Sequence, residues 1–225
     1  MDIITVQHVV DSMSIVIDTV LENESYFCEL DSAAGDGDFG SSLAKGFGAI
    51  RSNWESLNKD DIGAFVRDCS MIIIEKCGGA SGPIWGTALM QAGRYAKGKK
   101  QMGVEELSGF FQAMVDGVQK VGGAELGDKT MLDALIPTTE SLKRSALKHE
   151  GMLLALRKSV KAAEDGATST RKIAAKKGRA SYLGNRSIGY YDAGAKAIAI
   201  ILANILEKYF AKGAAHDPNE NAGLQ

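Results

Sequence analysis

The chain has 225 residues, of which 45% are hydrophobic and 24% are charged, with a formal net charge of −2. These values are ordinary for a soluble globular protein. The longest uninterrupted apolar stretch, 197–203, is far shorter than the roughly 18 residues of a membrane-spanning helix, so no membrane span is expected. Cys28, Cys69 and Cys77 form no CxxC pair and no basic signal-peptide start precedes Lys45, which favours a cytoplasmic location over a disulfide scaffold or a zinc ribbon.

Apolar residues recur at helical spacing through most of the chain and predict eight helices. The first begins behind Thr5, an expected N-cap, and ends near Leu21. The other seven are expected near 42–54, 60–76, 83–97, 104–121, 131–147, 152–175 and 191–211. Alternating patterns typical of strands are nearly absent. We therefore predict an all-α protein with a single domain over 1–211 and a flexible, polar C-terminal tail over 212–225.

Glycine is concentrated in four connections, which follow the first, third, fifth and seventh predicted helices. They read DSAAGDGDFGSS (31–42), CGGASG (77–82), GGAELGDKTM (122–131) and GRASYLGNRSIGYYD (178–192). The remaining connections are short, which favours antiparallel neighbouring helices. In an up-and-down array all odd-numbered connections lie at one end. The four glycine-rich loops are therefore expected to form one rim that carries the functional site.

The first of these loops places the carboxylates of Asp31, Asp36 and Asp38 within eight residues. Carboxylates this close repel one another unless a cation lies between them. The intervening glycines allow the backbone to turn several side chains toward one point. Hard oxygen ligands suit Mg²⁺ or Ca²⁺ rather than zinc. The sequence thus indicates a metal site, and the alternative is a solvated acidic turn in which the Asp residues cap helices.

This segment fits none of three familiar loop patterns. An EF-hand starting at Asp36 needs Glu at its twelfth position, where Phe47 stands. GDGDFG has the letters of the dinucleotide fingerprint, but no strand precedes it and its two Asp residues would repel a pyrophosphate. A P-loop needs Lys where Ser41 stands. A phosphate is therefore expected to approach this loop only across bridging cations.

Two further features of the rim suit phosphate. Gly40, Ser41 and Ser42 lead into a helix, whose free N–H groups and hydroxyls can receive phosphate oxygens, although either Ser can equally cap the helix. CGGASG is a second amide-rich turn, or the end of the preceding helix. Arg179 in the fourth loop is either a phosphate clamp or a partner in a surface salt bridge.

The third loop offers Asp128 or Thr130 as caps for the next helix. Met131 follows at the rim, where its polarizable side chain can pack on a purine or belong to the core.

Charge is segregated along the chain, with nine acids and no Lys or Arg in residues 1–44 and twelve basic residues against three acids in 143–186. The basic charges are spread along a long helix with few aromatic residues, so a solvated face or a protein-docking surface is expected, and no nucleic acid. His8, His149 and His216 all lie outside the glycine-rich loops, which disfavours a His-based triad or a phosphohistidine at this rim.

Taken together, the motifs resemble those of a known family. GDGDFGSSLAKGF, GGASGPIWGTAL, GDKTMLDAL and GRASYLGNRSIGYYDAGA are similar to the L subunit of dihydroxyacetone kinase, or to the nucleotide-binding domain of single-chain dihydroxyacetone kinases. The resemblance runs from about residue 5 to 210. It implies an eight-helix antiparallel up-and-down barrel that holds ADP or ATP at one rim through two Mg²⁺ ions.

The resemblance also implies roles for individual residues, motif by motif. Asp31, Asp36 and Asp38 match the magnesium ligands, and Arg179 matches an arginine that contacts phosphate. The phosphate-holding turns match Phe39, Gly40, Ser41, Ser42, Ala80 and Ser81. Positions near the adenine match Gly122 and Met131, and the family's D-P-G stretch matches Asp192 and Gly194, with Ala193 in place of Pro.

In this family a separate K subunit holds the keto-sugar covalently, and the L chain, often a homodimer, brings the nucleotide to it. Two kinds of phosphoryl donor are known in the family, exchangeable ATP and a retained ADP that a phosphohistidine-bearing M subunit recharges. Phe39 stands where the phosphotransferase-system-dependent subunits commonly have His, so the donor stays open. The acceptor is dihydroxyacetone or a related small ketose such as erythrulose.

We therefore expect a Mg²⁺-dependent phosphoryl-transfer subunit of a dihydroxyacetone kinase, in which cations, Arg179 and helix-start amides position the phosphates. One alternative is a non-enzymatic helical binding protein with a structural cation site. Another is a dinucleotide oxidoreductase, which would need a parallel sheet.

Overall fold

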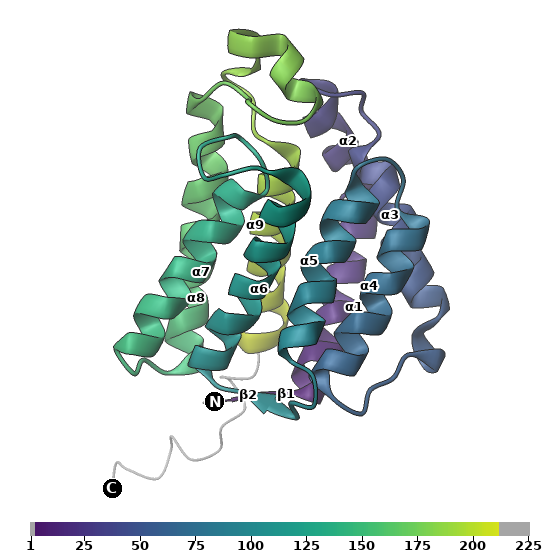
Figure 1. Cartoon of the computed structure of the whole chain (residues 1–225), viewed down its shortest axis with the longest axis vertical. Coiled ribbons are helices and arrows are strands. Elements are labelled where there is room, and N and C mark those ends of the chain that lie inside the picture. Colours follow the sequence, from purple (N-terminus) through teal and green to yellow (C-terminus); the bar gives the residue numbers. More distant parts are fainter. Residues whose placement is uncertain (1–2, 212–225) are drawn as a thin grey trace, which may run out of the picture.

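The computed structural model describes residues 3–211, with the backbone alone for 209–211. This part of the chain is almost entirely helical (Figure 1). In this part of the chain the α-helices are α1 (Val6–Glu22), α2 (Glu24–Ser32), α3 (Phe39–Ser52), α4 (Ile62–Lys76), α5 (Ser81–Tyr95), α6 (Val104–Gly122), α7 (Leu132–Leu147), α8 (Met152–Ser169) and α9 (Ala193–Ile205). Short 3₁₀ segments are η1 (Trp54–Ser56), η2 (Thr170–Lys172) and η3 (Arg179–Ser187), and a π-helical turn, η4 (Leu206–Ala211), follows α9.

Two very short strands are the only sheet within residues 3–211. β1 (Ile4–Thr5) pairs antiparallel with β2 (Gln101–Met102), and Ile4 lies opposite Met102. The predicted all-α class is confirmed, and the parallel sheet that a dinucleotide oxidoreductase would need is absent from the described residues. The same residues contain no helix with both the length and the apolar character to cross a membrane.

The predicted number of eight helices is corrected to nine α-helices within the described part of the chain. The first predicted helix stops at Asn23, whose backbone N–H and side-chain amide both donate to the carbonyl of Thr19. The chain then resumes as α2, so Asp31 lies in the last turn of a helix and not in a loop. The expected N-cap Thr5 is confirmed, because its hydroxyl accepts the N–H of His8.

The helix predicted over 152–175 ends earlier, at Ser169. The hydroxyls of Ser169 and Thr170 donate to the carbonyls of Gly166 and Ala167, three residues back, and the backbone tightens into η2. Side chains that hydrogen-bond locally in this way compete with helix continuation. The predicted tail over 212–225 lies outside the described residues, and the single domain over 1–211 stays a prediction.

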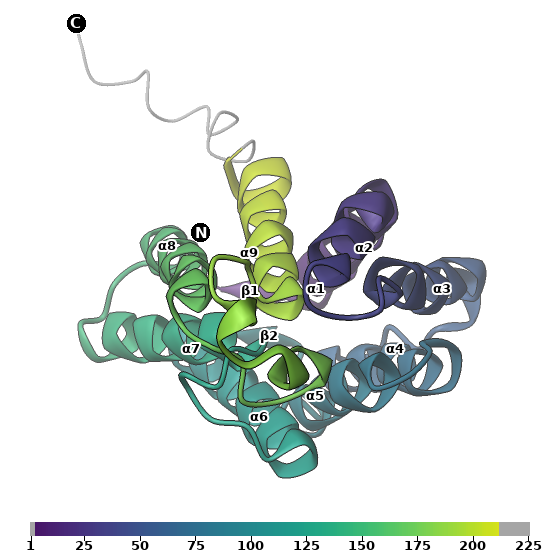
Figure 2. The ribbon, with the colours of Figure 1, turned by 90° about the horizontal axis from the view of Figure 1, so that it is seen from above.

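The helices pack in chain order around a shared apolar core (Figure 2). From α3 to α9 each helix contacts the next one along the chain, and α1 contacts both α3 and α9. Fully buried side chains from four helices fill the core, among them Phe27, Leu43, Phe47, Phe65 and Leu132. Trp85 meets Phe47 edge to face, at 6.3 Å between ring centroids, so the core reaches the rim through this tryptophan.

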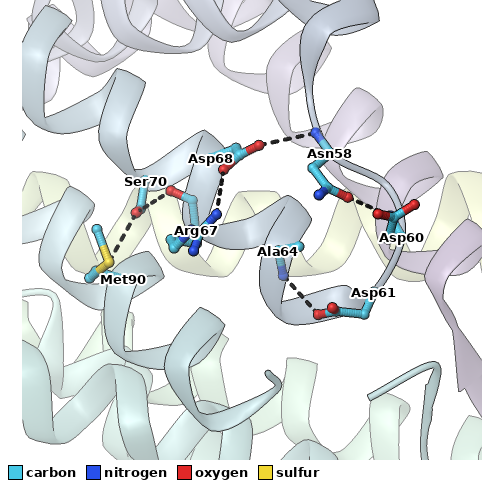
Figure 3. A network of polar contacts seen from close by, with 8 residues as sticks. All are labelled: Asn58, Asp60, Asp61, Ala64, Arg67, Asp68, Ser70 and Met90. Carbon is cyan, nitrogen blue, oxygen red and sulfur yellow. Dashed lines mark hydrogen bonds and ion pairs between the residues drawn. The ribbon is translucent and has the colours of Figure 1, made fainter. Parts of the chain in front are cut away.

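The start of α4 lies at the lower end of the bundle in Figure 1, opposite the glycine-rich loops. Side-chain hydrogen bonds hold it there (Figure 3). The carboxylate of Asp61 accepts the N–H of Ala64 at 2.8 Å, as an N-cap does. Just before it, the N–H of Asn58 donates to Asp68 at 3.0 Å, and the Asn58 side chain accepts the N–H of Asp60 at 2.7 Å. These bonds fix the α3–α4 connection without contacting the rim.

Replacing Asp61 with Ala is expected to lower the free energy of unfolding by about 1 kcal/mol, since α4 loses its N-cap. The Ala64 amide holds the pKa of the Asp61 carboxyl below its ordinary value, so its stabilisation is present above the unfolded pKa and is lost as pH falls through the folded pKa. Urea unfolding at pH 7 and pH 3 measures both effects. An Asp61→Ala protein that loses as much stability as the wild type between pH 7 and pH 3 would contradict this account.

Candidate functional site

The four glycine-rich connections meet at one end of the bundle, at the top of Figure 1, around a cavity of about 290 Å³. Residues from all four line it, as predicted from their places at every second connection, and in the structure these connections follow α2, α4, α6 and α8. The candidate residues that line it are Asp31, Asp36, Asp38, Phe39, Ala80, Ser81, Gly122, Met131, Arg179, Asp192 and Gly194. Three other candidates, Gly40, Ser41 and Ser42, belong to the first turn of α3 behind this lining.

The three acidic side chains of the first loop converge. Carboxylate oxygens of Asp31, Asp36 and Asp38 all lie within 4.8 Å of one another. Asp31 is half-buried at the end of α2, and one of its oxygens accepts the N–H of Gly37 at 2.9 Å. Gly37 has a φ of +75°, a left-handed conformation that glycine adopts readily and that turns the loop back on itself. A cluster of hard oxygen donors at this spacing fits Mg²⁺.

Helix capping does not account for this cluster. Asp38 occupies the N-cap position of α3, yet its side chain makes no capping hydrogen bond. Instead the hydroxyl of Ser41 donates to the Asp38 carbonyl at 2.9 Å. The Asp38 carboxylate is therefore left exposed beside Asp31 and Asp36.

Arg179 brings the fourth loop to the first. It opens η3, directly after Gly178, and its guanidinium forms an ion pair with Asp36 while more than half exposed. The salt bridge named as the alternative to a phosphate clamp is thus present, and it places the permanently charged guanidinium at the edge of the carboxylate cluster.

Two helices start at the cavity without a side-chain cap. The N-cap residues of α3 and α5 are Asp38 and Ala80, and neither makes a capping hydrogen bond through its side chain. The N–H groups of a first helical turn lack partners within the helix and favour anions. Phe39 contributes to this wall through its backbone, because its ring packs between Phe27 and Trp85 in the core.

The capping role predicted for Asp128 or Thr130 falls to Thr130, whose hydroxyl accepts the N–H of Leu132, the first residue of α7, at 3.2 Å. Asp133, the second residue of α7, returns the contact, because its carboxylate accepts the N–H groups of Gly127 and Thr130, both at 2.7 Å. Asp128 accepts the N–H of Glu125 and pairs with Lys176, and the Glu125 amide is the main cause of its lowered pKa. The spacing of Thr130 and Asp133, which matches a capping box with Asp in place of Glu, was the available signal.

Met131, Asp192 and Gly194 form a tight junction on the cavity wall. A Cβ atom at Gly194 would lie 3.1 Å from the Cβ of Met131 and 3.2 Å from a carboxylate oxygen of Asp192. Asp192 caps α9 by accepting the N–H of Ala195 at 2.7 Å. Burial raises the pKa of Asp192 to about 7, and the charge of Asp133 adds to this rise.

Sequence reasoning missed several residues that line the same cavity. They are Ile84, Trp85, Lys129, Thr130, Lys177 and Tyr191, among others. Lys129 is the least expected of them, because it lies in a loop between Asp128 and Thr130 and is nevertheless only 2% exposed. No sequence signal marks a loop lysine as buried, since lysine is almost always on the surface.

Comparison with known proteins agrees with this geometry. The chain is 37% identical over 177 residues to the PEP-dependent dihydroxyacetone kinase, ADP-binding subunit DhaL, of Escherichia coli, covering 79% of this chain and 84% of that protein. It is also 37% identical over 202 residues to the corresponding subunit of kinase 2 of Listeria innocua, covering 89% and 92%.

A solved structure of the dihydroxyacetone kinase of C. freundii, in complex with AMP-PNP and Mg²⁺, superposes with a TM-score of 0.67 at 26% identity. The match covers 89% of this chain and 33% of the kinase, so the chain spans about a third of that longer protein. Residues 33–207 match the DAK2 domain. The resemblance to dihydroxyacetone kinase L subunits is thereby confirmed, and the chain belongs to the DAK2 domain family.

Proposed function

We propose that this chain is the nucleotide-binding, phosphoryl-transfer subunit of a dihydroxyacetone kinase, and that it holds ADP or ATP with Mg²⁺ in the cavity at the glycine-rich rim. The observation that carries the proposal is the convergence of three carboxylates within 4.8 Å, beside Arg179 and the uncapped starts of α3 and α5. Its relatives support it, since two are ADP-binding kinase subunits and a similar structure contains AMP-PNP and Mg²⁺.

In this proposal the phosphates lie between the carboxylates and the helix starts. Asp31, Asp36 and Asp38 hold two Mg²⁺ ions, which neutralise the phosphate charge when bound. The N–H groups of the turns at 39–42 and 80–81 receive phosphate oxygens, and Arg179 stabilises the terminal phosphate through its fixed, bidentate guanidinium. Catalysis in this chain is then positioning and electrostatic stabilisation, with no nucleophile of its own.

The adenine lies on the opposite wall in this proposal. Gly122 and Met131 border it, and the junction of Asp192 and Gly194 closes that side of the cavity. Met131 is mostly buried but lines the cavity, where its polarizable apolar side chain can pack on a purine.

The acceptor and its pocket belong to a partner in this proposal. Exposed apolar side chains stand on the third and fourth rim loops, namely Leu126, Tyr182, Ile188 and Tyr190, and they support docking of a dihydroxyacetone-binding K subunit over the cavity. We place the chain in the cytoplasm as a homodimer, with a phosphohistidine-bearing M subunit as the donor if ADP is retained. The contacts of α1 with α3 and α9 support a closed eight-helix barrel, with α2 as an addition outside it.

The nucleotide that co-purifies with the protein tests this function. Mass spectrometry of material released by denaturation is expected to show ADP or ATP, and removal of Mg²⁺ by EDTA is expected to release it from the folded protein. Resistance of bound ADP to exchange with labelled ATP indicates a retained coenzyme, whereas rapid exchange indicates ATP as substrate. Protein that binds Ca²⁺ but neither ADP nor Mg²⁺ would instead indicate a structural cation site.

A further inference from the structure

Lys129 combines three unusual properties. It is 2% exposed, it has a φ of +61°, and its ammonium donates to two backbone carbonyls, those of Thr170 and Tyr190, at 2.6 Å each. A left-handed non-glycine residue and a buried ammonium each cost free energy. Burial lowers the pKa of this ammonium, and the charges of Asp192 and Asp133 oppose that shift.

The two carbonyls belong to segments far from Lys129 in the sequence. Thr170 follows α8 directly, and Tyr190 lies in the fourth glycine-rich loop. The ammonium therefore joins three separate segments at one point on the cavity wall.

This point lies next to the proposed adenine wall in both segments of the chain that form that wall. Lys129 is two residues before Met131, and Tyr190 is two residues before Asp192. Thr170 adds a second tie, because its hydroxyl oxygen accepts the N–H of Asp192 at 3.0 Å. A displacement of Lys129 would thus move Met131 and Asp192 relative to each other.

The carboxylate end of the cavity is held by other bonds. Asp31 is fixed by the N–H of Gly37, and Asp36 is paired with Arg179. None of these groups bonds to Lys129, so the hydrogen bonds at the two ends of the site can be disturbed separately, and the link between them is the charge of Asp31 acting on Asp192.

We propose that Lys129 is a positioning residue for the adenine side of the nucleotide site, an inference that rests on the function proposed above. Its ammonium fixes the separation of Met131 and Asp192, and it does not act on the metal-binding end.

The test compares two Lys→Met variants, each of which removes an ammonium that bonds to a glycine-rich loop. Lys129 donates to Tyr190 in the fourth loop, and Lys176 pairs with Asp128 in the third. Lys129→Met keeps an unbranched apolar side chain. Met, like Lys, is a non-glycine residue, so the free-energy cost of the left-handed backbone at this position stays the same. Lys176→Met is the matched control, because Lys176 is 65% exposed in its side chain and pairs with Asp128 outside the cavity. The affinity of each protein for Mg²⁺–ADP is measured by calorimetry, and its affinity for Mn²⁺ alone by electron paramagnetic resonance.

Lys129→Met is expected to bind Mg²⁺–ADP at least about tenfold more weakly, as a displaced binding group does, with its Mn²⁺ affinity unchanged. Lys176→Met is expected to match the wild type in both. Unchanged ADP affinity in Lys129→Met would overturn the proposal, and so would a parallel loss of Mn²⁺ binding, which indicates general structural damage. A wild-type protein that binds Mn²⁺ but no ADP would overturn the proposed function itself.

If Lys129→Met does not fold, Lys129→Gln decides the question. It removes the ammonium that donates to the carbonyls of Thr170 and Tyr190 but leaves a polar side chain with N–H donors of its own in the buried position. Weaker ADP binding with intact Mn²⁺ binding supports the positioning role, and wild-type ADP affinity contradicts it.

Discussion

Replacing Asp36 with Asn is expected to lower the affinity for Mg²⁺–ADP by at least about a hundredfold. Replacing a residue that only hydrogen-bonds to a metal ligand typically lowers metal affinity by about ten- to hundredfold, and loss of a ligand itself is expected to cost more. Asn keeps the shape of the side chain but removes one of the three negative charges that lie within 4.8 Å of one another. Because Asp36 is exposed and lies in a loop, helix content and the unfolding midpoint are expected to change little.

Asp36 also pairs with Arg179, so the two roles must be separated. Calorimetry of Asp36→Asn and Arg179→Met, with and without Mg²⁺, does this. If Asp36 is a metal ligand, its substitution abolishes the Mg²⁺ dependence of ADP binding, whereas Arg179→Met weakens binding and retains that dependence. Asp18→Asn is the control, because Asp18 pairs with Arg51 on the outer surface. Equal and Mg²⁺-independent losses in the two site variants would show that only the ion pair matters.

The carboxylate cluster was predictable because its three members are close in sequence. Eight residues with two intervening glycines leave the chain few ways to keep Asp31, Asp36 and Asp38 apart, and the structure brings them together. The meeting of four distant loops was also predictable, since it follows from helix order alone. Lys129 could not be predicted, because its partners Thr170 and Tyr190 are 41 and 61 residues away and both offer only backbone carbonyls.

Helix α2 escaped prediction for a different reason. Phe27 is its only fully buried residue, so it has no apolar stripe of the kind that helical periodicity detects. A short helix of this sort is held by contacts with its neighbours and not by its own pattern. Its neighbours are α3, α9 and α1, and the contact with α3 depends on one glycine.

Gly40 has a packing role between α2 and α3 that its motif did not predict. The sequence predicts that Gly40 belongs to a phosphate-holding turn. In the structure it is buried in the first turn of α3, where a Cβ atom would lie 2.0 Å from the carbonyl oxygen of Glu24 and 2.8 Å from the backbone nitrogen of Cys28. The absence of a side chain is therefore what allows α2 and α3 to approach each other.

Gly40→Ala is accordingly expected to lower the free energy of unfolding by about 3 kcal/mol, at the upper end of overpacking effects, since both close contacts are with backbone atoms. Gly48→Ala is the matched control on the same helix, because its Cβ would meet only Leu21, at 3.9 Å. Replacing glycine with alanine there is expected to be neutral or to stabilise the helix by up to about 1 kcal/mol. Urea unfolding of the two variants measures the difference.

The same substitution is expected to weaken Mn²⁺ binding, because Asp31 is carried by α2 while Asp38 precedes α3, and the added methyl group separates the two helices. If Gly40 served only to expose its amide to phosphate, Gly40→Ala would reduce ADP affinity with wild-type stability and wild-type Mn²⁺ binding. Loss of stability together with loss of the metal site would instead show that the helix contact sets the spacing of the carboxylates.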